Sequence, residues 1–492
     1  MGTLLEQLAE KAKSHTPALP LKLLVVADCA GRDCDDGPLE VRASGVGGLI
    51  ERLRPAARLS IENRLQKGGA KLTLDLEFRK LDDFHPRALL SRSEILAEAA
   101  QEGHPALADQ LDEIVHHTEF QKQEAMWLGL DRVWRTIDGS ASIRLEVLPA
   151  NRKNLQERFH RLVFEPEFDG KTATPLSAVF FDFRFSHEPA DLSLLVALAA
   201  DCAALQCPMI AAVHPGFFQL KNLVHLPSLA DIAGRLQLPV YAGWRKFQTD
   251  PASRWACLTA NRFLAREPHA LAAGADFPVE YHERADAAHP EKYLWADAGW
   301  LVLCNLVRSF SRYHHCVILD GMGPETAHAG LPVRPFPKKA NVLVPSPTEI
   351  LIDDDKAWEI VRAGITMLVG ISDGAVATFP FLTDVYRLKP GVMTTESALS
   401  YQIFAGRLAH YLMELYPQLP PVDSNPEGTI EFLRERLGAF LVPFLADKPE
   451  ESVQLELTDT GGESKGKVLN IRLKPVLRMQ GKEVDFTLQL AF

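Results

Sequence analysis

The sequence predicts an α/β protein with α+β elements: a small β-rich part, a large part built of βαβ units, and a tail of antiparallel strands. Short apolar runs alternate with helical segments through the middle of the chain, and strict apolar–polar alternation occurs near both ends. Apolar residues make up 47% of the 492 residues and charged residues 24%. This composition is ordinary for a protein with a sizeable core, and the length allows about three domains.

The first hundred residues carry the β-rich part. Residues 1–15 mix Glu and Lys with leucines, which predicts a short amphipathic helix and lacks the apolar core of a signal peptide. Residues 21–27 form an apolar run typical of a buried strand and end in an acidic turn. Residues 72–78 alternate apolar and polar side chains, the pattern of a half-buried strand. Because residues 99–106 contain glycine and proline, we expect a first domain over residues 1–100.

Residues 107–440 are expected to form an α/β core. Leu107, Leu111, Ile114 and Val115 fall on one face of a helix with a 3.6-residue period. Further on, strands and helices alternate, which predicts parallel strands joined by right-handed crossovers. The expected units are strand 177–183, helix 191–206 and strand 208–213; helix 295–313 and strand 316–321; and helix 353–364 and strand 365–371.

The tail, residues 441–492, changes character. Its apolar residues alternate with polar ones, which predicts consecutive antiparallel strands that reach the last residue. A terminal strand with no further chain beside it leaves backbone N–H and C=O groups unpaired, and a strand from a neighbouring molecule can complete it. The candidates for such inter-subunit pairing are the apolar residues of the last two stretches: Leu469, Ile471, Leu473, Val484, Phe486, Leu488 and Leu490.

Charge and cysteine content limit the function classes. The net charge is −11 and Lys and Arg form no concentrated stripe, so a nucleic-acid-binding surface is not expected. Seven cysteines, several of them within apolar runs, predict free buried thiols in a reducing cytosol. The most apolar stretch, residues 192–213, is interrupted by Asp201 and Gln206, so no membrane insertion is expected. The sequence therefore predicts a cytoplasmic protein.

One pattern supports an enzymatic alternative. Residues 370–374 match G-x-S-x-G, in which Ser372 would be the nucleophile of a serine hydrolase. A predicted strand precedes it, and Asp384 and His410 follow in the order of a hydrolase triad. The next residues form a poor helix, however, because Pro380 and several β-branched and aromatic residues interrupt it. A serine hydrolase that uses Ser372 is therefore kept as the alternative function.

The histidine and cysteine pairs do not predict a metal site. Adjacent histidines on a helix point about 100° apart, so neither His116–His117 nor His314–His315 can chelate one ion as i, i+4 histidines do. Cys29 and Cys34 have no second ligand cluster at zinc-like spacing. We expect no metal, no cofactor and no catalytic residue.

A series of motifs in fixed order resembles one protein family, the contractile sheath of type VI secretion (TssB/TssC, also VipA/VipB). From residue 107 on, the chain resembles the large subunit, whereas the first hundred residues resemble the small subunit. The large-subunit motifs are residues 107–130, SAVFFDFRF, CPMIAAVHPGFF, RWACLTANRFLAR, YLWADAGWLV, SRYHHCVILDGMGPETAHAGLPVRPF, PSPTEILIDD and FAGRLAHYL. The small-subunit motifs are LKLLVVAD, IENRL, LTLDLEF and LDDFHP.

The resemblance implies a non-enzymatic structural subunit. In the family, subunits assemble into a helical tube around an inner tube, and contraction propels that inner tube outward. The partners implied are further copies of the chain, the inner tube protein and baseplate components, and the histidines become packing residues. A AAA+ unfoldase reads a helix in the long amino-terminal segment of the family's large subunit; the small-subunit-like part stands in its place here, which leaves recycling by an unfoldase open. Two alternatives also stay open, a monomeric scaffold and a sheath-capping protein.

Overall fold

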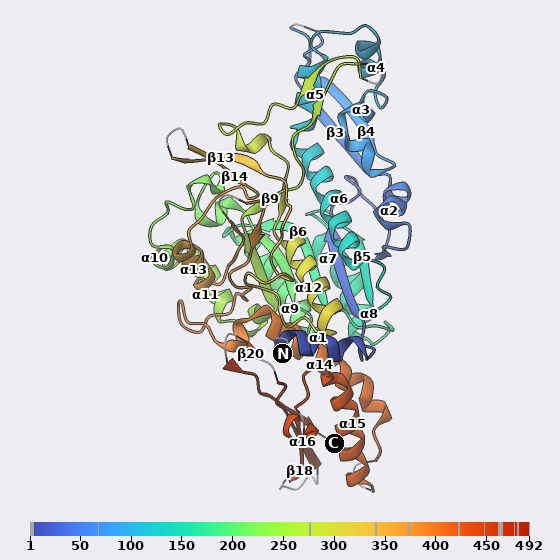
Figure 1. Cartoon of the computed structure of the whole chain (residues 1–492), viewed down its shortest axis with the longest axis vertical. Coiled ribbons are helices and arrows are strands. Elements are labelled where there is room, and N and C mark those ends of the chain that lie inside the picture. The colour runs from blue at the N-terminus through green and yellow to red at the C-terminus, as the bar shows by residue number, and fades with distance from the viewer. Residues whose placement is uncertain are drawn as a thin grey trace.

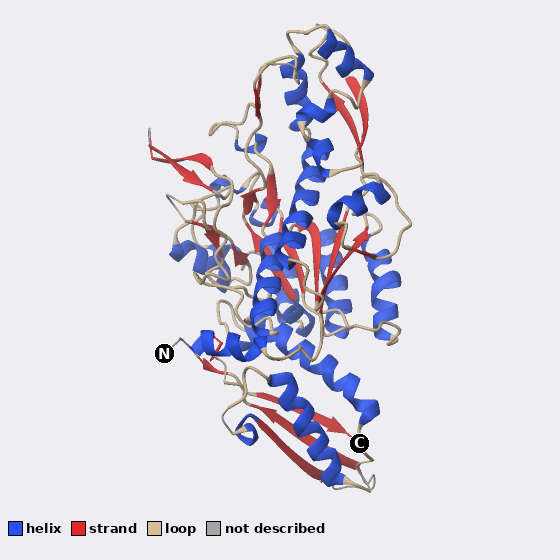
Figure 2. Cartoon of the chain, turned by 45° about the vertical axis from the view of Figure 1, so that its right-hand side comes forward, coloured by secondary structure: helices blue, strands red, loops and turns tan. Residues whose placement is uncertain are grey.

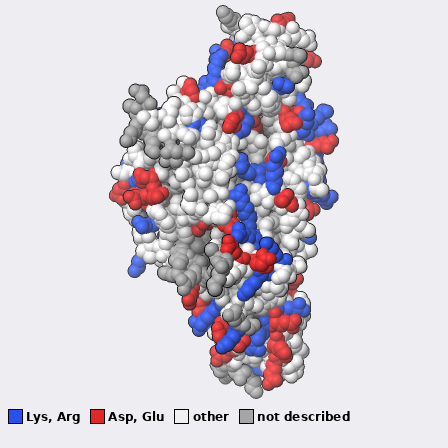
Figure 3. Space-filling view, viewed as in Figure 1, with Lys and Arg blue, Asp and Glu red and all other residues white. Residues whose placement is uncertain are grey.

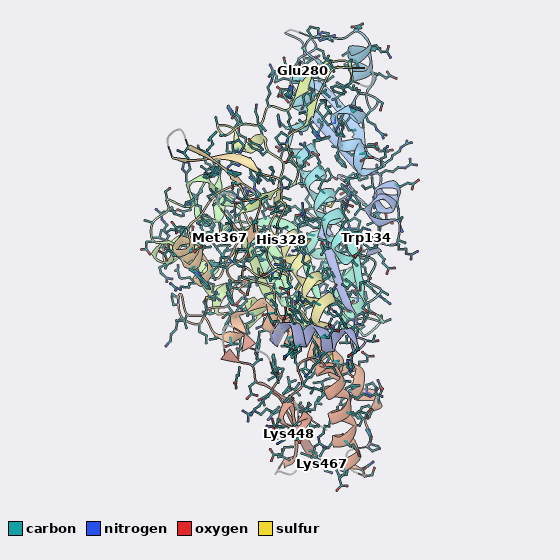
Figure 4. All side chains as sticks on the ribbon, viewed as in Figure 1. Trp134, Glu280, His328, Met367, Lys448 and Lys467 are labelled. Atoms are coloured by element: carbon teal, nitrogen blue, oxygen red, sulfur yellow. The ribbon has the colours of Figure 1, made fainter. Side chains whose placement is uncertain are left out.

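The computed structural model describes residues 4–66, 68–274, 277–339, 342–371, 374–421, 424–446, 448–460, 466–476, 478–479 and 482–491. The molecule is elongated, with a central body between two smaller lobes (Figure 1). The distal lobe contains β3, β4 and α3 to α5, and the C-terminal lobe contains α15, α16 and the last strands. Glu280 lies at the distal end and Lys448 and Lys467 at the other (Figure 4).

A seven-stranded sheet forms the body, in the order β15-β8-β7-β6-β1-β5-β2. All neighbouring strands are parallel except β2, which runs antiparallel to β5 at one edge. The bounds are β1 Leu21–Ala27, β2 Leu39–Glu40, β5 Ile143–Pro149, β6 Ala178–Phe185, β7 Met209–Val213, β8 Ala256–Ala260 and β15 Thr366–Met367. The predicted α/β class is thus confirmed, and so is the first βαβ unit, β6–α9–β7.

Helices cover both faces of this sheet, which explains why its strands are predominantly apolar (Figure 2). All seven residues of β1 are buried: Leu23 and Val25 face one core cluster, and Leu24 and Val26 face the other. The first cluster lies under α2 Gly45–Leu53, α5 Leu107–Val115, α6 Thr118–Ile137 and α12 Gly299–Tyr313. The second lies under α7 Leu155–Phe159, α9 Pro189–Ala204, α11 Ala242–Thr249 and α13 Asp354–Arg362.

The boundary expected near residue 100 does not separate two sheets. Strand β1 comes from the small-subunit-like part, yet it lies between β5 and β6 of the large-subunit-like part. The same core cluster contains residues from both parts, among them Leu59 of β3 and Trp300 of α12. The division into residues 1–100, 107–440 and 441–492 therefore describes resemblance along the sequence: the first two parts share the central sheet and a core cluster, whereas the last strands form a sheet of their own.

The distal lobe is a hairpin covered by short helices. Its strands are β3 Ala56–Ile61 and β4 Leu72–Glu77, and its helices are α3 Pro86–Leu89, α4 Glu94–Gln101 and α5. Leu72, Leu74 and Leu76 are buried and Thr73 and Asp75 exposed, which confirms the predicted alternation. The four apolar residues of the predicted helix face in α5 are each fully buried.

Two expected strands differ from the prediction. Residues 316–321 form no strand, because side chains of α12 bind their backbone: Asn305 Nδ2 donates to Leu319 O (2.9 Å), and Ile318 N donates to Ser309 Oγ (3.1 Å). Residues 365–371 form two short strands: Thr366–Met367 pairs with β8, whereas β16 Val369–Gly370 turns away to pair with β17 Ala377–Thr378. An apolar run alone did not distinguish a strand from a buried loop whose backbone is bonded by side chains.

The remaining helices and strands link these parts. The strands β9 Arg262–Leu264 and β12 Trp295–Asp297 pair beside α12, and β10 Ala270–Leu271 pairs with β11 Tyr281–His282 near the distal lobe. A hairpin of β13 Arg334–Lys339 and β14 Val342–Ser346 projects from the body, and its prolines agree with the expected loop or edge. The other helices are α1 Leu4–Lys13, α8 Glu165–Phe168, α10 Ile232–Arg235 and α14 Leu399–Leu415. Among the described helices, none is long and apolar enough to span a membrane.

Helices α6 and α12 meet at a glycine. A Cβ built on Gly129 of α6 would lie 2.5 Å from the indole ring of Trp300, which itself packs edge-on against Phe180 of β6. Only glycine permits this approach, because the indole is enclosed by the sheet behind it.

Gly129→Ala is therefore expected to destabilise the fold by about 1–3 kcal/mol through overpacking. Gly47→Ala in α2 is the matched control, since a Cβ there meets nothing within 4 Å and alanine favours helix. Urea unfolding of both variants measures the difference. Equal stability of Gly129→Ala and the unchanged chain would show that the two helices can separate without cost.

Candidate assembly surface

The C-terminal lobe is a single antiparallel sheet covered by helices on one face. Its strands are β18 Val453–Thr460, β19 Gly466–Leu473 and β22 Phe486–Ala491, in the order β18-β19-β22. A small hairpin of β20 Arg478–Met479 and β21 Lys482–Glu483 connects the last two. The helices α14, α15 Pro426–Leu441 and α16 Pro449–Ser452 complete the lobe. The predicted antiparallel tail is confirmed, but the lobe also needs α14 and α15, which precede residue 441.

An aromatic cluster holds the last strand on these helices. Phe486 stacks on Tyr401 and Phe404 of α14, with ring centroids 4.8 Å apart in both pairs. Phe404 in turn meets Phe440 of α15 edge-on at 5.8 Å. This cluster was not predicted from the sequence. The signal was present in the FAGRLAHYL helix, where Phe404 lies one helical turn from Leu408, but its partner Phe486 is 82 positions away along the printed sequence.

The structure brings the seven candidate residues together in one core, where they contact their own chain. Leu469, Ile471 and Leu473 are fully buried, Val484 and Phe486 nearly so, and Leu488 and Leu490 are partly buried against the same cluster. Any contact that this sheet makes with a neighbour must therefore come from the backbone or from its outward face.

The two candidate strands differ in their edges. The backbone of β19 pairs with β18 on one side and with β22 on the other, so it offers no free edge. In contrast, β22 pairs only with β19 among the described strands, so none of them covers its second edge. We therefore restrict the expectation of inter-subunit pairing to β22 and withdraw it for Leu469, Ile471 and Leu473.

The outward face of the sheet is polar and internally bonded. Arg472 of β19 forms a bidentate pair with Asp485, with N···O distances of 2.9 and 2.5 Å to the nearer carboxylate oxygen. Next to it, Gln489 Nε2 donates to Asn470 Oδ1 across the strands (2.9 Å). These cross-strand contacts fix the register of β22 against β19, so its free edge has a defined position.

Two buried side chains attach the C-terminal lobe to the body. Arg407 of α14 donates to Pro20 O (2.9 Å) and Leu19 O (2.8 Å), just before β1, and to Ser177 Oγ (3.0 Å), just before β6. His315, after α12, bonds through Nε2 to Phe440 O of α15 (2.8 Å). His315 is thus a packing residue, as the resemblance implies, and these hydrogen bonds connect the lobe to the body.

Two buried histidines make stability depend on pH. Burial, together with the smaller effect of nearby arginines, lowers the pKa of His315 and of His328 to about 3. In the unfolded chain a histidine has a pKa of about 6.5, so between these values the unfolded state binds more protons. The contribution of these two histidines to the free energy of unfolding is therefore fully present above pH 6.5 and is lost as the pH falls toward 3.

We expect the free energy of unfolding to fall by roughly 2–3 kcal/mol per pH unit below pH 6.5 from these two groups. Urea titrations at pH 7.5, 6 and 5 measure the slope. In the double variant His315→Gln and His328→Gln, the free energy of unfolding should change less steeply with pH, whatever the absolute stability of the variant. An unchanged slope would show that both imidazoles are charged in the folded state.

A buried ion cluster attaches the segment between β9 and β12 to the distal lobe and α6. Arg266 Nε donates to Glu124 Oε1 of α6 (2.6 Å), and Arg266 Nη1 donates to Glu283 Oε2 (2.6 Å). Burial raises the pKa of Glu283, but its contacts with His116 and Arg266 outweigh burial and lower the pKa to about 2. Burial raises the pKa of Glu124, because only Arg266 opposes it there. The guanidinium of Arg266 is thus the common ion-pair partner of both carboxylates.

The residues of the hydrolase alternative are not assembled among the described residues. Ser372 lies outside them. Asp384 Oδ1 pairs with Arg387 Nη1 (3.0 Å), and His410 Nε2 bonds to Leu205 O (2.7 Å). After Gly374 the chain forms β17 instead of the helix that a nucleophile elbow requires. Likewise, the described residues contain no group of three or more metal-ligating side chains, and all seven cysteines are free thiols, six of them buried.

Two family models match the chain. The model of the EvpB/VC_A0108 tail sheath N-terminal domain (VipB) matches residues 101–381, which form most of the body. The model described as type VI secretion system, VipA, VC_A0107 or Hcp2 matches residues 7–127, which include β1, the distal lobe and the start of α6. The two matches overlap on α5 and α6, the helices that join the distal lobe to the body.

One curated relative is the type VI secretion system sheath protein TssC1 of Pseudomonas aeruginosa strain PAO1. It is 28% identical over 287 residues, which cover 56% of this chain and 58% of TssC1. The chain therefore spans less than two thirds of that relative.

Solved structures with partial similarity are also sheath proteins. They include the contracted PVC sheath of an extracellular contractile injection system (TM-score 0.37, 8% identity, 73% of this chain and 75% of that one). The sheath tail protein of Desulfitobacterium hafniense has a TM-score of 0.40 and 6% identity, over 96% of this chain and 97% of that one. The sheath tail protein of Listeria innocua has a TM-score of 0.38 and 8% identity, over 99% of each chain. TM-scores below 0.5 are too low to establish a common fold.

Proposed function

Because the chain belongs to the VipB tail sheath family, we propose that it is a structural, non-enzymatic subunit of a type VI secretion contractile sheath. The observation that carries the proposal is the match of the VipB model to more than half of the chain, directly after and overlapping a VipA match. One polypeptide would then supply the parts of a small and a large sheath subunit. The shared sheet supports this, since β1 from the VipA match lies between two strands of the VipB match.

The proposed assembly contact is the free edge of β22. Backbone N–H and C=O groups on that edge would accept a strand from a neighbouring copy, which extends the sheet from three strands to four. Its position at one end of an elongated molecule supports this, because an end-on contact propagates a polymer (Figure 1). The connection would be continuous yet able to pivot, as a contracting lattice requires, while the bodies move as rigid units.

The proposed partners are further copies of the chain, the inner tube protein and baseplate components, in the cytoplasm. Nucleic acid is not among them. Patches of Asp and Glu occur beside those of Lys and Arg on the face shown in Figure 3, and the net charge is −11. Such a surface lacks the single-sign field that draws a phosphate backbone to a protein.

Negative-stain electron microscopy of the purified protein, alone and with its tube partner, tests the proposal. We expect tubular polymers, and size-exclusion chromatography with light scattering should show species far above the 54.6 kDa of one chain. A 54.6 kDa species at all concentrations, with and without the tube, would contradict a sheath subunit and would favour a monomeric scaffold.

A further inference from the structure

A small pocket in the body lies beside the carboxyl ends of β1 and β6. The strand order of the sheet reverses at this point: β5 lies next to β1 on one side, and β7, β8 and β15 lie beyond β6 on the other. In parallel sheets ligands bind at such a reversal, outside the carboxyl ends of the strands. The pocket has a volume of about 280 Å³ and is lined by α6, β6, β9, β12 and α12. That volume is near the lower limit for ligand pockets and fits one small molecule or one side chain.

The pocket contains three cationic side chains, and each already has an anionic partner. Arg184 Nε donates to both carboxylate oxygens of Asp297 at 2.9 Å. Arg262 forms a bidentate pair with Glu349 at 2.6 and 2.7 Å. Lys122 Nζ lies 3.3 Å from Asp28 Oδ2.

Two carboxylates of the lining, Asp182 of β6 and Glu291, form no ion pair within 4 Å among the described residues, and Asp182 is the less exposed of the two. Its hydrogen-bond partner is the indole of Trp300. Burial and the neighbouring Asp297 raise the pKa of Asp182 to about 7, against the weaker opposing effects of Arg184 and Lys122. Ionised Asp182 is therefore destabilised by its surroundings, and a bound cation would relieve this.

The walls of the pocket also favour a cation. Tyr293, Trp295 and Trp300 line it, and aromatic faces attract ammonium and guanidinium groups. Arg262 already lies 6.0 Å from the ring centre of Trp295. An anion, in contrast, would meet Asp182 and Asp297 with no unpaired cation to receive it.

We propose that this pocket binds one primary ammonium group, which pairs with Asp182 against the aromatic wall. The source is either a free small amine or a lysine side chain of a second copy, and both present the same group. The inference goes beyond the proposed function, because binding of a free amine does not require a polymer.

Calorimetric titration of the purified chain with n-butylammonium, an analogue of the lysine side chain, tests the pocket. We expect binding that n-butanol, its uncharged counterpart, does not show. Affinity should rise about tenfold from pH 6 to pH 8, since Asp182 ionises in that interval. Asp182→Asn should weaken binding at least tenfold. Asp320→Asn is the matched control, because Asp320 is another buried carboxyl with a raised pKa, of about 6, outside the pocket.

No saturable binding of butylammonium, or equal binding by Asp182→Asn, would overturn the proposal. A second experiment distinguishes the two sources by carbodiimide coupling of carboxylates to amines in assembled protein, followed by peptide mass spectrometry. A link from Asp182 to a lysine of another copy assigns the pocket to a neighbour, whereas butylammonium binding without such a link assigns it to a free amine. Failure of the chain to polymerise leaves the calorimetric test unchanged.

Discussion

A single proline in β22 is expected to stop polymer growth while the chain stays folded, provided that the residue it replaces points its N–H away from β19. In an antiparallel pair the N–H and C=O of successive residues point alternately toward the partner strand and away from it. Of the neighbours Thr487 and Leu488, one therefore points its backbone at β19 and the other at the open edge. Proline at the outward position removes a donor that only a neighbouring copy could use.

Thr487→Pro and Leu488→Pro form a matched pair for this test. One variant should remain a folded monomer and lose polymers in negative-stain images. The other should lose a hydrogen bond to β19 and destabilise its own lobe, which a lower unfolding temperature would show. Tubes of normal length from both variants would exclude the β22 edge as the contact. Deletion of residues 484–492 is not a clean test, because Val484 and Phe486 belong to the core of the lobe.

Loss of the Arg266 guanidinium is expected to cost about 3–5 kcal/mol of stability, the cost of leaving buried charges unpaired. Arg266→Met leaves Glu124 and Glu283 buried, at 3% and 7% exposure, without their common cation. Arg135→Met on α6, the helix that carries Glu124, is the control. Its pair with Asp131 is exposed on the arginine side, so a change within about 0.5 kcal/mol is expected.

The pH dependence provides a second measurement on Arg266→Met. In the unchanged chain Glu283 has a pKa of about 2, below its unfolded value, so its contribution is constant at neutral pH and is lost only in strong acid. Without Arg266 the pKa of both carboxyls should lie above the unfolded value. The folded variant would then bind more protons than the unfolded variant. The difference in free energy of unfolding between the variant and the unchanged chain should therefore shrink as the pH falls from 7 to 5. Adding Glu124→Gln and Glu283→Gln should restore part of the loss, and urea unfolding measures each step.

The strands and helices with regular patterns were predictable from the sequence, and so was the family. The run at 21–27, the alternation at 72–78 and the α5 face each depend on local periodicity, which the fold preserves. Local patterns failed at residues 316–321, where Asn305 and Ser309 of α12 bind the backbone of an apolar run. No local signal reveals that two side chains on a preceding helix replace a strand partner.

The candidate surface was predictable only in part. Alternation identified the strands of the tail but not their order, and the order decides which strand keeps an open edge. The pairing of β19 on both sides and the stacking of Phe486 on Phe404 depend on contacts between residues far apart in sequence. The Asp182 pocket was missed for the same reason, since its groups come from five elements that only the sheet brings together.

The position of β1 has a consequence for synthesis. The ribosome releases residues 21–27 early, yet the strand's two neighbours are residues 143–149 and 178–185. A mostly apolar segment therefore stays without its strand partners until more than a hundred further residues have been translated. Long-range pairing of this kind is slow and exposes nascent chains to aggregation. Chaperone capture of the emerging amino-terminal third should thus govern how much of the protein the cell obtains.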